Sequence, residues 1–302
     1  LREKGRTAEQ TSYMWLYTTG SDAPTPIVLY DYQPSRKGSC AQNFPEGFRG
    51  LVQCDGYQGY NKLEDVILVC CLAHARRKFF EAVPAARRKR LKLLDINSDE
   101  AIEDISLPDE EEAKQLLPAE IGLLYCNKLF YLERTLKDLN PDERKQQRDV
   151  LEQPVWDQFW NWLDTLHPTG GSKLGKAVNY AQNHHDTLMN YLLDGRCEIS
   201  NNRAERKAKS YAIGWKAFLF HTSETGAGAS AVMYSIVETA KANNLNIFQY
   251  LYTVLLYMPD YTNSSAGIEQ LMPWSEFIKE QCSGLIDVES NVPEKRIPLP
   301  HR

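Results

Sequence analysis

Long apolar stretches are missing from this sequence of 302 residues. No uncharged run approaches the roughly 18 to 20 residues that a helix needs to cross a bilayer. The first residues, Leu1–Arg6, also lack the apolar core of a signal peptide. With 42% hydrophobic and 25% charged residues, the composition is typical of a globular protein. We therefore expect a cytoplasmic protein with no membrane partner.

The usual signatures of a disulfide framework and of a zinc site are missing too. The seven cysteines are an odd number and lie mostly in apolar surroundings, which favours reduced thiols. Cys70 and Cys71 precede His74, but no second Cys/His pair follows at ligand spacing. We predict a buried strand at this point and not a zinc site.

An excess of basic residues, typical of nucleic-acid-binding proteins, is also missing, because the net charge is −5. The charges are nevertheless segregated along the chain. Residues 72–92 hold eight basic side chains and the single acid Glu81, whereas residues 95–112 hold nine acids and no base. The acidic segment offsets the basic region in the net charge, so the net charge does not exclude a polyanionic partner.

The order of the predicted elements is strands first and helices afterwards, with no internal repeat. Alternation and β-branched or aromatic content predict strands, and apolar spacing of three to four residues predicts helices. The strands are expected at 12–19 and 26–32, which form a hairpin, and at 51–56 and 66–72, the last buried on both faces. The helices are expected at 73–83, 116–139, 142–166, 174–193, 231–243 and 247–258, with a loop at 226–230.

These elements predict an α/β fold in four parts. Residues 1–84 would form the first part of a sheet core, and residues 85–197 an acidic linker and a helical insertion. Residues 198–258 would supply the last core helices, and residues 259–302 a tail.

Two carboxylates are candidates for a shared metal site. Asp55 ends a short apolar strand before Gly56, and Glu205 lies in the first turn of a late helix. Grouped carboxylates hold Mg²⁺ in phosphoryl-transfer enzymes, because this hard cation prefers oxygen ligands. Basic side chains near both acids could contact a phosphate backbone; they are Arg76, Arg77, Lys78, Arg203 and Lys207.

Each candidate also has a purely structural interpretation. Asn202 and Glu205 fit a capping box at a helix start. Asp55 and Gly56 fit a turn after a strand, and the basic residues 76–78 fit a solvated helix face. Spacing alone leaves these interpretations open.

Six short motifs follow one another in an order that resembles the IS66 family of bacterial insertion-sequence transposases. The resemblance extends from about Ser12 to Tyr257. The motifs are Tyr-Asp-Tyr-Gln-Pro-Ser-Arg at 30–36, Asp-Gly-Tyr-Gln-Gly-Tyr at 55–60, Leu-Ala-His-Ala-Arg-Arg-Lys-Phe-Phe at 72–80, Ser-Lys-Leu-Gly-Lys-Ala at 172–177, Asp-Gly-Arg-Cys-Glu-Ile-Ser-Asn-Asn-Arg-Ala-Glu at 194–205 and Tyr-Ser-Ile-Val-Glu-Thr-Ala-Lys at 234–241.

The resemblance implies a DDE transposase with an RNase H-like mixed β-sheet core. Such an enzyme uses two divalent ions, Mg²⁺ or Mn²⁺, to cleave DNA and to transfer the strand to a target. By the matching motifs Asp55 and Glu205 would be metal ligands, and DNA and further copies of the chain would be partners. The first Asp of the family lies in an Asp-Glu-Thr motif that is absent before Ser12, so we expect weak metal binding.

The last site motif also departs from the family pattern. The family tends to have an Arg-Pro pair and a later Gly-Arg-Lys-Asn-Trp after this motif. This sequence has Lys209-Ser210 and Gly-Trp-Lys-Ala-Phe at 214–218 in their place. A lost guanidinium removes a bidentate phosphate contact that lysine does not replace. Two alternatives to an active transposase therefore stay open. One is a non-catalytic DNA-binding remnant, and the other is a helical protein-interaction module that uses residues 156–166.

Overall fold

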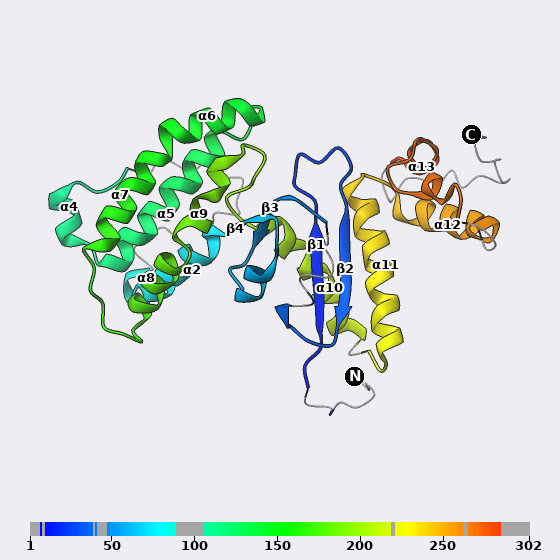
Figure 1. Cartoon of the computed structure of the whole chain (residues 1–302), viewed down its shortest axis with the longest axis horizontal. Coiled ribbons are helices and arrows are strands. Elements are labelled where there is room, and N and C mark those ends of the chain that lie inside the picture. Colours follow the sequence, from blue (N-terminus) through cyan, green and yellow to red (C-terminus); the bar gives the residue numbers. More distant parts are fainter. Residues whose placement is uncertain are drawn as a thin grey trace. The chain divides into compact units, whose positions relative to one another are not determined.

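The computed structural model describes residues 7, 10–38, 40, 47–88, 106–218, 221–261 and 265–284. Most of the acidic segment predicted at 95–112 lies outside these described residues. The chain divides into two compact units (Figure 1). The first unit combines Leu1–Arg36 with Ala204–Arg302, and the second unit is Lys37–Arg203. Both contain helices and a small sheet, so the fold is mixed α/β as predicted.

The first unit is built on an antiparallel hairpin, as the sequence predicts. β1 (Tyr13–Thr18) pairs with β2 (Val28–Gln33), with Tyr13 opposite Gln33 and Thr18 opposite Val28. The helical elements assigned here are α10 (Asn202–Phe218), whose first two residues belong to the second unit, α11 (Glu224–Ala242), α12 (Ile247–Tyr257), η3 (Met258–Tyr261), η4 (Ile268–Leu271) and α13 (Glu276–Cys282).

Helix α11 lies along β2 (Figure 1) and satisfies the backbone of its outer edge with side-chain hydroxyls. Thr239 Oγ1 accepts a hydrogen bond from the amide of Val28 at 3.0 Å. Ser235, one turn earlier, accepts from the amide of Tyr30 at 2.8 Å. Because alternate residues of an edge strand turn their amides outward, two hydroxyls one turn apart close this edge to further pairing.

The predicted loop at 226–230 is wrong, because these residues lie inside α11. The side chain of Ser223 accepts from the amide of Gly226 at 3.1 Å and caps the helix there. The small residues after the cap weaken the helical pattern in the sequence but do not prevent a helix that packs on a sheet.

The second unit contains a parallel pair of strands. β3 (Gly50–Cys54) pairs with β4 (Val66–Cys70) in register, with Cys54 beside Cys70. The helical elements of the unit are η1 (Gln58–Lys62), α2 (Leu72–Ala82), α3 (Ala85–Arg88), α4 (Glu110–Gln115), α5 (Pro118–Thr135), α6 (Pro141–Leu151), α7 (Gln153–Asp164), α8 (Lys173–Asn183), α9 (His185–Met189) and η2 (Asn190–Leu193).

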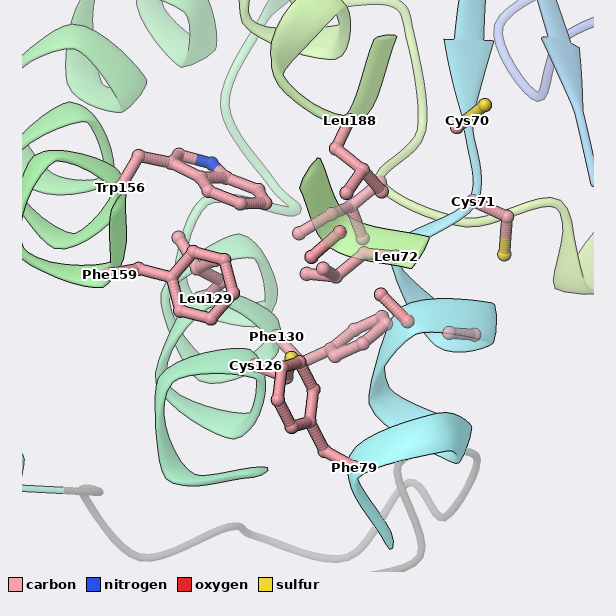
Figure 2. Close-up of a cluster of buried hydrophobic side chains, with 14 of the residues drawn as sticks. Cys70, Cys71, Leu72, Phe79, Cys126, Leu129, Phe130, Trp156, Phe159 and Leu188 are labelled. Atoms are coloured by element: carbon pink, nitrogen blue, oxygen red, sulfur yellow. The ribbon is translucent and has the colours of Figure 1, made fainter. Parts of the chain in front are cut away.

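A continuous apolar core joins the helices of the second unit. Phe79 of α2, Leu129 of α5, Trp156 of α7 and Leu188 of α9 are each almost fully buried and come together in Figure 2. Burying a side chain of this size contributes about 1.5–3 kcal/mol. This core packs the helices of the unit together with Cys54 of β3 and Val69 of β4.

Three details of the prediction for this unit are wrong. Ile67 on β4 is 45% exposed, so this strand is not buried on both faces. The helix expected at 142–166 is two helices, because Pro154 lacks an amide hydrogen for the preceding turn and instead sits in the first turn of α7. The helix expected at 174–193 is divided at His184, which ends α8.

None of the helices that the structure describes has the length and apolar character needed to span a bilayer. None of the seven cysteines, all of which are described, forms a disulfide, which confirms the prediction of reduced thiols.

Candidate metal and DNA site

Asp55 lies directly after β3, at the carboxyl end of the parallel pair. Its Oδ1 accepts a hydrogen bond from the amide of Tyr57 at 3.0 Å, and the Tyr180 hydroxyl donates to its backbone carbonyl at 3.4 Å. The residue is half-buried. The amide contact makes the chain turn after the strand, so Asp55 takes part in a turn and also presents a carboxylate at a sheet edge.

Gly56 allows this turn to pack closely against α8. Its φ is +77°, in the left-handed region. A Cβ at this position would lie 2.8 Å from the Tyr180 hydroxyl oxygen and 3.1 Å from His184 Nε2. The residue after Asp55 therefore has both a conformational and a steric reason to be glycine.

Cys54, Cys70 and His184 form a polar cluster next to Asp55. Cys70 Sγ lies 3.5 Å from His184 Nδ1. A hydrogen bond from Cys54 lowers the pKa of Cys70 against the effect of burial, and His184 lowers it further. The same bond to Cys70, together with burial, raises the pKa of Cys54. Nothing in the local pattern at 184 separates this histidine from a surface helix residue, so sequence reasoning missed it.

The predicted basic triplet on α2 divides into three different environments. Arg76 Nε donates to Asn127 Oδ1 on α5 at 2.6 Å. Arg77 is exposed. Lys78 Nζ lies 4.8 Å from the centre of the Tyr180 ring, a cation–π contact that joins α2 to the side chain beside Asp55.

Glu205 lies in the first turn of α10 and is partly exposed. The helix begins at Asn202, which makes Asn201 the residue at the capping position. A cap at Asn201 would place Ala204, and not Glu205, at the third helical position, whereas the predicted capping box has Asn202 as its cap. The amide of Asn201 donates to Cys71 Sγ at 3.4 Å, which holds the start of the helix at the end of β4.

The segment before α10 follows the ends of both strands of the second unit. Gln53 on β3 donates its side-chain amide to the carbonyl of Glu198. The amide of Leu72, at the start of α2, donates to the carbonyl of Ile199 at 3.1 Å. Residues 198–201 are thus hydrogen bonded to the region from which Asp55 extends.

The two basic candidates on α10 differ in their surroundings. Arg203 is partly exposed. Lys207 Nζ pairs with Glu238 Oε2 at 2.9 Å, and Lys241 pairs with the other oxygen at 2.8 Å. Burial opposes ionisation of Glu238, but the hydrogen bonds from Lys241 and Lys207 outweigh it and lower its pKa. Lys207 therefore already has an anionic partner within the first unit.

Asp55 belongs to the second unit and Glu205 to the first. Among the described residues, no three His, Cys, Asp or Glu side chains form a group arranged to hold a metal ion. The segment at 198–201 precedes Glu205 in the sequence and is hydrogen bonded to the second unit, which contains Asp55.

Comparison with known proteins identifies the family. The profile of the IS66 transposase family matches residues 1–229, and that of the IS66 C-terminal element matches residues 235–274. The chain belongs to the IS66 transposase family. The resemblance inferred from the six ordered motifs is therefore confirmed at the level of the family.

Curated relatives of this IS66 chain occur in Sinorhizobium fredii. The uncharacterized protein y4hP is 28% identical over 279 residues, which cover 87% of this chain and 47% of the relative. The uncharacterized protein y4jD is 27% identical over 289 residues, which cover 90% of this chain and 51% of the relative. The IS66 chain spans about half the length of these relatives. No solved structure matches it.

Proposed function

We propose that this IS66 chain is the catalytic region of a DNA transposase that cleaves and joins DNA strands with divalent metal ions. The observation that carries the proposal is the segment at 198–201, which is tied to β3 and to the start of α2. It leads directly into the helix of Glu205, three residues after Asn202 and thus about 4.5 Å further along the axis. Membership of the transposase family supports the proposed reaction class.

Asp55 and Glu205 would hold the metal ions. Both offer carboxylate oxygens, which are the ligands that Mg²⁺ and Mn²⁺ prefer, and both are partly accessible. When bound, two such ions stabilise the attacking and the leaving oxygen of an in-line displacement at phosphorus. The Asp-Glu-Thr motif that would carry the first carboxylate of the family triad does not occur in residues 1–302, so this chain would bind metal weakly.

Arg77, Lys78 and Arg203 are the proposed contacts to the DNA backbone. Arg76 and Lys207 would have to exchange their partners, Asn127 and Glu238, for a phosphate. Phosphate contacts release counterions, so binding should weaken as salt rises. The DNA would include the ends of the insertion sequence and the target, and further copies of the chain would assemble on it in the cytoplasm.

An RNase H-like mixed β-sheet is the proposed core of the fold. The residues that the structure describes include one antiparallel and one parallel pair of strands. The outer edge of β2 is occupied by α11, which leaves β1 as the strand of this hairpin that could extend the sheet. This arrangement supports a larger mixed sheet that β1 would extend.

Calorimetric titration with Mn²⁺ tests the proposed metal site. The double variant Asp55→Ala/Glu205→Ala should lose the binding heat that the unchanged chain shows. The matched control Asp164→Ala/Glu224→Ala also removes two carboxylates, both exposed and one of them in a first helical turn, and should bind as before. Equal binding by all three proteins would reject the site.

A non-catalytic DNA-binding remnant is the second candidate, favoured by the departures at 209–218. It predicts salt-dependent DNA binding with no nicking under any metal. A protein-interaction module at residues 156–166 finds no support, because Trp156, Phe159 and Leu163 are at most 2% exposed. These side chains form the core of the second unit.

A further inference from the structure

Arg148 on α6 is a fully buried arginine, with 0% of its side chain exposed. Its Nε donates to Glu133 Oε1 at 2.5 Å, and one terminal nitrogen donates to Glu133 Oε2 at 2.8 Å. This is the bidentate geometry in which a guanidinium matches a carboxylate. The charge of Arg148 is therefore balanced inside the helical insertion.

The other donors of Arg148 bind backbone carbonyls of a single segment. They reach Tyr191 at 2.8 Å, Asp194 at 3.0 Å and Cys197 at 2.8 Å. A guanidinium has five N–H groups, and five hydrogen bonds are formed. No donor remains for another role, so this side chain serves to hold residues 191–197.

Arg144, one turn earlier on α6, holds the same segment. It donates to the carbonyl of Gly195 at 3.1 Å. Gly195 itself packs on α6 so closely that a Cβ would lie 1.8 Å from the carbonyl oxygen of Pro141. Arg144 and Arg148, which we call the α6 arginine pair, thus hold residues 191–197 on α6. The close approach of this segment to the helix requires glycine at position 195.

A neutral acid completes the buried cluster around Arg148. Burial, together with the charge of Glu133, raises the pKa of Glu152 to about 9. At neutral pH Glu152 is therefore protonated, and Arg148 and Glu133 remain as one balanced ion pair. The Tyr191 hydroxyl donates to Glu152 Oε2 at 2.5 Å and accepts from Trp156 Nε1 at 3.1 Å. This network also fixes Tyr191, whose carbonyl Arg148 binds.

The fixed segment continues directly into residues 198–201, which precede the helix of Glu205. Arg148 donates to the carbonyl of Cys197. The carbonyl of the next residue, Glu198, accepts a hydrogen bond from the side chain of Gln53 on β3. We propose that the α6 arginine pair are positioning residues that set the path of residues 198–201 and thereby the placement of the metal ligand Glu205. This inference rests on the proposed metal site and adds to it a distant control of its geometry.

The variant Arg148→Lys tests the inference in the full 302-residue chain. Lysine keeps the charge beside Glu133 but has three donors in place of five and no planar fork. Hydrogen exchange should become faster in residues 198–201, and Mn²⁺ affinity measured by calorimetry should fall roughly tenfold, as for other residues that orient ligands. Arg144→Lys, at a less buried position, is the second variant if Arg148→Lys does not fold.

Lys145→Met is the matched control, because Lys145 lies between the pair on α6 and forms an exposed ion pair with Asp149. It should leave both measurements unchanged. If a folded arginine variant shows the same hydrogen exchange in residues 198–201 and the same Mn²⁺ affinity as the unchanged chain, the inference is wrong. If the unchanged chain binds no Mn²⁺, the proposed function fails and with it the effect on Glu205. Unchanged exchange in residues 198–201 would reject the arginine pair as positioning residues, whatever the metal does.

Discussion

Thr239 on α11 binds both backbone groups of Val28 on β2. Its hydroxyl accepts from the amide at 3.0 Å and donates to the carbonyl at 2.9 Å. All three groups are buried, and Val28 and Thr239 lie 211 residues apart in sequence. This single side chain therefore replaces a strand partner and ties the C-terminal part of the first unit to its hairpin.

Replacing Thr239 with valine should destabilise the first unit with little change in shape. Valine has nearly the same volume but leaves the amide and carbonyl of Val28 without their partner, at about 1–3 kcal/mol for each buried group. Urea unfolding would measure the loss. Thr225→Val, the same change at an exposed position of the same helix, should alter stability by less than about 0.5 kcal/mol. A Thr239 variant as stable as this control would contradict the prediction.

Local patterns in the sequence predict those elements whose stability depends on nearby residues. The hairpin formed by 12–19 and 26–32 follows from alternation and composition, and β1 and β2 confirm it. The aromatic face at 155–163 is likewise evident from helical spacing, and Trp156 is fully buried. In both cases the apolar side chains that form the core are also the ones that define the pattern.

The candidate site could be predicted only as separate residues. The motifs identify Asp55 and Glu205, but no local pattern predicts which distant residues contact them. Arg148 lies in a strongly polar helix, so the local pattern indicates a surface residue. It is buried because it binds distant groups such as the carbonyl of Tyr191, which is 43 residues away. His184 reaches Cys70 over 114 residues. Such contacts depend on how distant helices pack, which periodicity does not contain.

Gly56→Ala should destabilise the second unit and weaken Mn²⁺ binding together. A residue with a Cβ pays about 1–2 kcal/mol for the left-handed conformation, and the Cβ would also crowd Tyr180 at 2.8 Å. The turn that presents Asp55 should then shift. Thermal unfolding and calorimetry would measure the two effects.

Gly170→Ala is the control for this substitution, because a Cβ there meets nothing within 4 Å. It should leave metal binding intact and change stability little, or raise it by about 0.4–1 kcal/mol. The geometry assigned to Gly56 would be refuted if the two alanine variants behaved alike.

Glu152→Gln should remove a pH dependence from the stability of the second unit. The pKa of Glu152 is raised by burial from 4.5 to about 9 in the folded chain. Between these values the folded state keeps a proton that the unfolded state releases, so the free energy of unfolding falls as pH rises. The slope for one such group is about 1.4 kcal/mol per pH unit. Glutamine does not titrate and keeps an oxygen that can accept from Tyr191.

The difference in stability between Glu152→Gln and the unchanged chain should therefore grow in favour of the variant from about pH 5 to about pH 9. Below the lower limit the acid is protonated in both states, and the two curves should run parallel. Urea unfolding at a series of pH values measures this, with Glu143→Gln, an exposed position on α6, as the control. Curves that run parallel across the whole range would mean that Glu152 is ionised in the folded chain, and that the buried network around Arg148 carries two negative charges instead of one.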